Sequence, residues 1–135
     1  MNSQQHILDI RTGTDIVYIP RLEAAYQRFG DAFFKRVLTP SELAYCKNNF
    51  NKISGRIAVK EAVAKALGTG IRGLGWAAGA PWQDIEVQSE NNAVPTLTLH
   101  GRALEYAQEQ GIADWRISLS HDGEYATATV LGLIR

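Results

Sequence analysis

Cysteine is almost absent from the sequence: Cys46 is the only one in 135 residues. An internal disulfide is therefore excluded, and a cysteine-based metal cluster lacks its ligands. Long apolar runs are missing too, since no stretch approaches the roughly 20 residues that a membrane-spanning helix needs. The opening residues, MNSQQHILDIR, lack a basic segment followed by an apolar one, so we expect no signal peptide. These absences predict a reduced, cytoplasmic protein without a membrane partner.

A surplus of charge of either sign is also missing. The chain has 14 Lys and Arg residues against 14 Asp and Glu residues, so its formal net charge is zero. Binding to nucleic acid or to a membrane surface therefore has no global electrostatic support, and any site for an acidic partner must be local. Because 45% of the residues are apolar, one core can form. The length favours a single domain over residues 1–135.

The pattern of apolar and turn residues predicts an α+β fold. Alternating β-branched residues indicate a strand over 6–19. Three helices are marked by start signals: Pro20, the capping box TPSE at 39–42, and the segment from Gly55 onward. We expect these helices to cover 20–30, 41–49 and 55–68. The remaining elements are expected to be two strands, a helix and a hairpin: 83–87, 95–100, 101–111, 115–121 and 124–133. Clustered elements of this kind favour a mainly antiparallel sheet.

The segment GRIAVKEAVAKALGTG, residues 55–70, combines an apolar stripe with charges on two other sides. The stripe expected to be buried consists of Val59, Ala62, Val63, Ala66 and Leu67. Glu61 and Lys65 lie one turn apart on a second face, and Arg56 and Lys60 lie one turn apart on a third. One interpretation is an i,i+4 ion pair of about 0.3 kcal/mol and a solvated flank. The other interpretation is a binding or catalytic face.

Glycines follow this helix in unusual number. Gly68, Gly70 and Gly73 match the pattern G-x-G-x-x-G. A dinucleotide site needs that pattern between a strand and a helix, whereas here it follows a helix, so we reject that interpretation. A cap at Gly68 followed by a flexible loop explains the first glycine. The others allow the backbone to approach another molecule closely.

Several segments together resemble one family. They are GTDIVYIPRL (13–22), FFKRVLTPSE (33–42), GRIAVKEAVAKALGTGI (55–71), DIEV (84–87), PTLTLHG (95–101) and ISLSHDGEYATATV (117–130). In this order they resemble the holo-acyl carrier protein synthases, the small bacterial type of phosphopantetheinyl transferase, from about Thr12 to Leu133. The loop GIRGLGWAAGAPWQ is longer and more apolar than is usual for that family.

The resemblance implies a fold and a reaction. The implied fold is the 4'-phosphopantetheinyl transferase-like one, a mainly antiparallel sheet packed with a long central helix and shorter helices. The implied reaction moves the 4'-phosphopantetheine arm of coenzyme A to a serine of apo acyl carrier protein and releases adenosine 3',5'-bisphosphate, a step that serves fatty acid biosynthesis. Mg²⁺ suits this chemistry because it binds one or two carboxylates together with phosphate oxygens. The resemblance implies Asp15 and Glu61 as those carboxylates, and the small Gly13 beside Asp15 would admit a large ligand.

The resemblance also implies other site residues. Lys65, one turn after Glu61, would neutralise the diphosphate and is counted with Asp15 and Glu61 as catalytic. The base that takes the serine proton stays open between Glu61, Asp15 and a water that they hold, which we favour. The residues implied to bind coenzyme A are Arg56, Lys60, Lys65, Gly68, Gly70, Ser120 and His121.

Two of these residues have alternative interpretations. Ser120, His121 and Asp122 contain the residue types of a hydrolase triad, but three consecutive residues of a strand do not easily stack in the required order. His121 shares its strand parity with Ile117 and Leu119, so it could be an ordinary half-buried histidine.

An acidic carrier protein needs a local basic face on a neutral enzyme. Arg21, Arg28, Phe33 and Arg36 are expected to form that face, and plain solubility is the alternative. The resemblance further implies a homotrimer with active sites at subunit boundaries. Two other functions remain open: a non-catalytic module that binds coenzyme A or a carrier protein, and a Mg²⁺-dependent phosphotransferase acting on another diphosphate.

Overall fold

The computed structural model describes residues 6–69, 82–89 and 94–135. Within these residues the strands form a three-stranded sheet of order β1-β5-β4 and a two-stranded sheet of β2 and β3, with every pairing antiparallel. The predicted α+β fold with mainly antiparallel pairing is confirmed. The strands are β1 (Asp9–Tyr18), β2 (Ile85–Gln88), β3 (Thr96–Leu99), β4 (Ile112–Asp122) and β5 (Tyr125–Ile134). The helices are α1 (Ile19–Phe29), α2 (Asp31–Val37), α3 (Pro40–Cys46), α4 (Phe50–Ala66), the short 3₁₀ helix η1 (Trp82–Asp84) and α6 (Gly101–Glu109).

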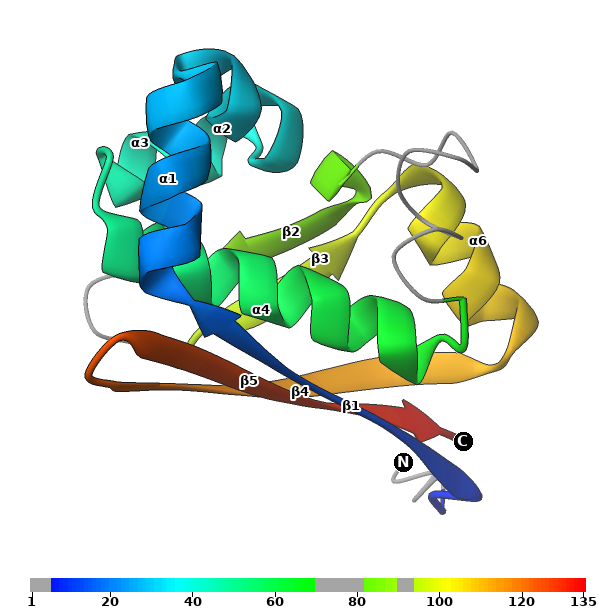
Figure 1. Cartoon of the computed structure of the whole chain (residues 1–135). Coiled ribbons are helices and arrows are strands. Elements are labelled where there is room, and N and C mark those ends of the chain that lie inside the picture. Colours follow the sequence, from blue (N-terminus) through cyan, green and yellow to red (C-terminus); the bar gives the residue numbers. More distant parts are fainter. Residues whose placement is uncertain (1–5, 70–81, 90–93) are drawn as a thin grey trace.

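The long helix α4 lies at the centre of the molecule. It crosses one face of the three-stranded sheet, with β2 and β3 on its other side, α1 to α3 gathered at one end and α6 near the other (Figure 1). The stripe predicted to be buried is buried as expected: Val59, Ala62, Val63, Ala66 and Leu67. Burial nevertheless extends right round the helix, because every residue from Ile53 to Lys60 is also buried. The exposed residues of α4 lie only before and after this stretch, at Asn51, Lys52 and Lys65, so the stretch itself needs no amphipathic pattern.

Two sequence predictions about the helices are wrong. Between β1 and residue 69, the end of the first described range, four helices occur where three were predicted, because Asp31–Val37 forms the separate helix α2 after a break at Gly30, where φ is 67°. The central helix begins at Phe50 and not at Gly55, since the Asn49 side chain accepts a hydrogen bond from the backbone N–H of Lys52 at 3.1 Å. This cap satisfies a free N–H group at the start of the helix.

Gly13 is where β1 crosses α4. A Cβ atom at this position would lie 1.8 Å from the backbone oxygen of Ala62, which no real structure tolerates. The expectation that Gly13 leaves room for a ligand is therefore wrong: the missing side chain admits the helix backbone. Since side chains two residues apart in a strand share a face, Asp15 also points toward α4, close to Glu61.

The helices of the described residues all lie on one side of the three-stranded sheet, and none of them covers its opposite face (Figure 1). We call it the open face and define it by Ile10, Ile16, Tyr18, Tyr125 and Thr129, which are solvent-exposed. The rings of Tyr18 and Tyr125 contact each other across β1 and β5 at 5.2 Å. Within the described residues, no helix has the length and apolar character needed to cross a membrane.

Candidate active site

Asp15 of β1 and Glu61 of α4 form a carboxylate pair between the sheet and the central helix. Burial and, to a lesser extent, the adjacent Asp15 carboxyl group together raise the pKa of Glu61 to about 8. Two negative charges held so close together repel each other unless a proton or a cation lies between them. Oxygen Oδ2 of Asp15 is buried and has no hydrogen-bond partner among the described residues.

This donor set fits a hard divalent cation. Mg²⁺ takes one or two carboxylates and fills its other positions with waters and substrate phosphate oxygens, so a complete protein cage is not needed. No group of three or more His, Cys, Asp or Glu side chains suitable for a metal occurs in the described part of the chain. The pair and its unpartnered oxygen therefore suit Mg²⁺ better than a metal that needs three or four protein ligands.

Lys65 completes the charged cluster. Its ammonium group donates to Asp15 Oδ1 at 2.9 Å and to the backbone oxygen of Thr14 at 3.0 Å. The side chain of Lys65 is still 54% exposed, so its charge faces outward as well as toward Asp15. Lys65 also counteracts the raised pKa of Glu61. The ion pair of Lys65 thus joins α4 to Asp15 of β1, where the sequence had suggested a pair with Glu61 along the helix.

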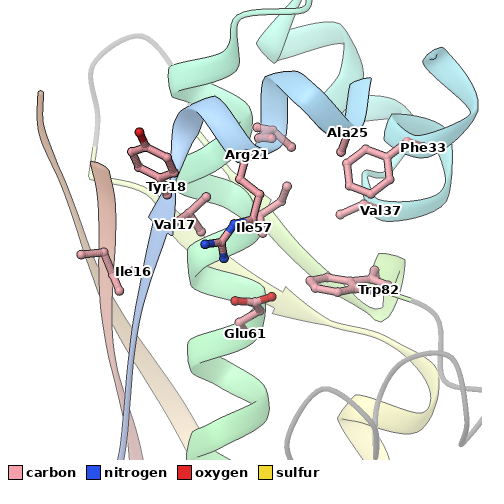
Figure 2. A pocket seen from close by; sticks show the side chains of 11 residues that line it. Ile16, Val17, Tyr18, Arg21, Ala25, Phe33, Val37, Ile57, Glu61 and Trp82 are labelled. Carbon is pink, nitrogen blue, oxygen red and sulfur yellow. The ribbon is translucent and has the colours of Figure 1, made fainter. Parts of the chain in front are cut away.

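An apolar cavity of about 270 Å³ opens beside Glu61. Figure 2 shows the Arg21 guanidinium and the Glu61 carboxyl group extending into it toward one another. The remaining walls are mainly apolar and include Val17, Leu22, Phe33, Ile57 and Trp82. Trp82 and Ile57 were not predicted as site residues, because their only sequence signal is apolar character, which core residues share.

Lys60 and Arg56 are buried, so the solvated flank, one of the two interpretations of this helix, is wrong. Lys60 has no exposed surface, and its ammonium group pairs with Glu42 Oε1 at 2.9 Å. Arg56 is only 5% exposed; it donates to Ser89 Oγ at 2.7 Å, and its guanidinium lies 4.5 Å from the centre of the Tyr45 ring. Lys60 is therefore not available to coenzyme A in this structure, whereas Arg56 stays a predicted ligand.

The other residues predicted to bind coenzyme A are only partly brought together. Gly68 has a φ of 78°, and its N–H donates to Lys65 O at 3.0 Å, so it ends α4; Gly70 lies outside the described residues. His121 bonds through Nε2 to Asn51 O at 2.8 Å, and because a carbonyl only accepts, Nε2 carries the proton. Ser120, the residue before His121 in the strand, points to the open face, so the two side chains do not meet. A hydrolase triad is not formed.

The predicted docking residues cluster around α1 and α2. Arg21 and Phe33 line the cavity beside Glu61, while Phe33 and Arg36 also line a second hollow with Phe29. Arg28 lies with its guanidinium 5.1 Å from the centre of the Phe29 ring. Three arginines and two phenylalanines thus form one basic and apolar surface next to the carboxylate pair.

The raised pKa of Glu61 predicts how stability changes with pH in the metal-free protein. The folded state keeps the proton up to about pH 8, whereas the unfolded chain loses it near the ordinary value of 4.5. The folded state therefore binds more protons over this range, and its stability falls as pH rises toward 8. Thermal unfolding in EDTA should give a lower Tm at pH 8.5 than at pH 5.5. Glu61→Gln should reduce this difference, and an equal slope in both proteins would contradict the assignment.

The comparisons with known proteins agree with this geometry. A sequence model of the 4'-phosphopantetheinyl transferase superfamily matches residues 11–130. The chain belongs to this superfamily. It is 47% identical over 124 residues to the holo-[acyl-carrier-protein] synthase of Gloeobacter violaceus, with 89% of both chains covered. It is 43% identical over 123 residues to the synthase of Herpetosiphon aurantiacus, covering 90% of this chain and 97% of the relative.

Solved structures of the superfamily share the fold. The holo-[acyl-carrier-protein] synthase of Helicobacter pylori in complex with coenzyme A superimposes with a TM-score of 0.75 at 34% identity, covering 90% of this chain and 98% of that one. The synthase of Neisseria meningitidis gives a TM-score of 0.77 at 35% identity, covering 90% and 96%. The family and the fold inferred from the sequence are thus confirmed.

Proposed function

We propose that this chain is an enzyme that transfers the 4'-phosphopantetheine arm of coenzyme A to a serine of apo acyl carrier protein and releases adenosine 3',5'-bisphosphate. The observation that carries the proposal is the meeting of Asp15, Glu61 and Lys65 beside an apolar cavity, in a chain whose relatives are named for this activity. A module that only binds its ligands does not need a buried pair of carboxylates, which makes the non-catalytic alternative weaker.

The charged residues would have different roles in cleaving the diphosphate. Asp15 and Glu61 would hold Mg²⁺, which when bound neutralises charge on the phosphate oxygens. Lys65 pairs with Asp15, and its ammonium group is exposed enough to turn toward the diphosphate. There it would stabilise the charge that develops on the leaving phosphate. The base that accepts the serine proton is one of the two carboxylates or a water that they orient.

The test is a mass measurement on the acceptor. Purified protein, coenzyme A, Mg²⁺ and an apo acyl carrier protein should yield a carrier that is heavier by one phosphopantetheine arm, together with adenosine 3',5'-bisphosphate. The same mixture with EDTA should leave the carrier unchanged. If the carrier keeps its mass although an established transferase modifies it, the chain is a binding module.

The basic surface of α1 and α2 is proposed to dock the acidic carrier. Arg28→Glu with Arg36→Glu should raise the apparent KM for the carrier roughly tenfold, since opposite charges mainly speed association. The KM for coenzyme A should stay within twofold, and added salt should narrow the difference between variant and parent. Arg102→Glu, which reverses an exposed charge on α6, serves as the control. Equal changes in both KM values would remove the docking assignment.

The open face is proposed to join three copies of the chain, with each active site at a subunit boundary. Its exposed isoleucine and tyrosine side chains form an apolar surface that a monomer would leave in water. Light scattering should then give three times the chain mass of 14.9 kDa. We also propose that the enzyme works in the cytoplasm, together with the substrates of this reaction.

A further inference from the structure

Lys60 stands next to the catalytic candidate Glu61 in the sequence but points to a different part of the molecule. Its ammonium group is fully buried and makes three polar contacts: an ion pair with Glu42, and hydrogen bonds to the backbone oxygens of Trp82 and Ile85. An ammonium group has three protons to donate, so these partners match its capacity. No proton of Lys60 is left for a ligand in this arrangement.

Glu42 makes two further hydrogen bonds, one within α3 at its N-cap and one to β2. Its Oε1 accepts from the N–H of Thr39 at 2.9 Å and its Oε2 accepts from the N–H of Val87 at 2.9 Å. The pair of Glu42 and Lys60 therefore connects α3, α4, η1 and β2 at one buried point. Removing one member would leave an unpaired buried charge, which is strongly destabilising.

Trp82 links this point to the cavity. It is the first residue of η1, its backbone oxygen accepts from Lys60 at 3.2 Å, and its indole ring forms a wall of the cavity that Glu61 enters. Figure 2 shows the indole of Trp82 facing the same space as the Glu61 carboxyl group. Consecutive residues of α4 thus provide the carboxylate and hold the wall opposite it. With an apolar side chain at position 60, the carbonyls of Trp82 and Ile85 would lose this donor.

We propose that Lys60 is a positioning residue that sets the distance between Glu61 and the Trp82 wall, and that it does not bind coenzyme A. The proposal rests on the proposed function, because it assigns the cavity to the reacting part of the substrates. It differs from a stabilising role in one respect: the effect of Lys60 on catalysis passes through the position of Trp82. Loss of the contact should therefore lower kcat without weakening coenzyme A binding.

The test follows Trp82 directly and separately from activity. The chain has three tryptophans, so protein labelled with 5-fluorotryptophan should give three ¹⁹F resonances, and Trp82→Phe identifies the one from Trp82. Lys60→Met should move or broaden the Trp82 resonance and leave that of Trp115 in place. It should lower kcat at least tenfold, with the dissociation constant for coenzyme A by calorimetry within twofold. Lys52→Met, which removes an exposed lysine of the same helix, should change none of these.

The opposite results overturn the proposal. A tenfold weaker affinity for coenzyme A with an unmoved Trp82 resonance would make Lys60 a ligand. A lower Tm with kcat and the resonance unchanged would make it merely structural. If Lys60→Met fails to fold because Glu42 is left charged, Glu42→Gln with Lys60→Met removes both charges and is judged by the same criteria. If the parent protein does not modify a carrier, the proposed function fails, whereas the ¹⁹F spectra still decide whether Lys60 holds Trp82.

Discussion

Glu61→Gln should lower the rate of phosphopantetheine transfer by about a thousandfold, the effect expected when a group that stabilises the charge of the transition state is removed. Glutamine keeps the shape of glutamate but carries no negative charge. With Asp15 as the remaining carboxylate, the site would hold Mg²⁺ weakly, and the diphosphate would lose its neutralising cation. The measurement is the initial rate of carrier modification, followed by mass spectrometry at saturating coenzyme A.

The same variant should remain folded, because the metal-free Glu61 is already largely protonated at pH 7. With a pKa of about 8, its native form in the absence of metal is close to a neutral amide in charge and shape. The Tm without metal should therefore match or exceed that of the parent. Mg²⁺ should raise the Tm of the parent and not that of the variant, since only a bound ligand stabilises the folded state. Glu109→Gln, an exposed position of α6, is the matched control, and transfer that survives in Glu61→Gln would refute the metal assignment.

Local patterns were sufficient to predict much of the fold. Alternation predicted β1, the Thr39 box predicted the start of α3, and the order of strands around α6 predicted the antiparallel sheet. The helix α2 was missed because it has only seven residues and follows directly after Gly30. The first turn of α4 was missed because its only start signal is the Asn49 cap, which is weak in the sequence. Such short elements are fixed by tertiary packing more than by their own propensity.

The site was less accessible to sequence reasoning from the residues alone. The pairing of Asp15 with Glu61 came from the family resemblance, because no spacing rule connects a strand to a helix so far along the chain. The burial of Lys60 was missed for a related reason. A lysine on a helix is normally exposed, and it is buried here because Glu42 and two backbone carbonyls, all from other elements, gather around it. Partners of this kind appear only after the chain has folded.

Gly13→Ala should be among the most damaging single substitutions in the chain. The added Cβ atom would lie 1.8 Å from the backbone oxygen of Ala62 and 3.1 Å from the backbone nitrogen of Ala66. Both neighbours are main-chain atoms of a buried helix, so they cannot rotate away as a side chain could. Either β1 separates from α4 or the helix shifts. We expect a loss of about 3 kcal/mol or more in the free energy of unfolding, measured by urea titration.

The control is Thr12→Ala, the neighbouring position, whose side chain is exposed on the other side of β1 and which should cost less than about 0.5 kcal/mol. The damage at Gly13 should also reach the site, because Asp15 lies on the same face of the strand and is carried by the same backbone. If Gly13→Ala still folds, Mg²⁺ should therefore raise its Tm much less than it raises the Tm of the parent protein. A variant with the parent's stability and Mg²⁺ response would show that β1 does not cross α4 at this glycine. The argument that Asp15 lies beside Glu61 would then fail, and so would the proposed metal site.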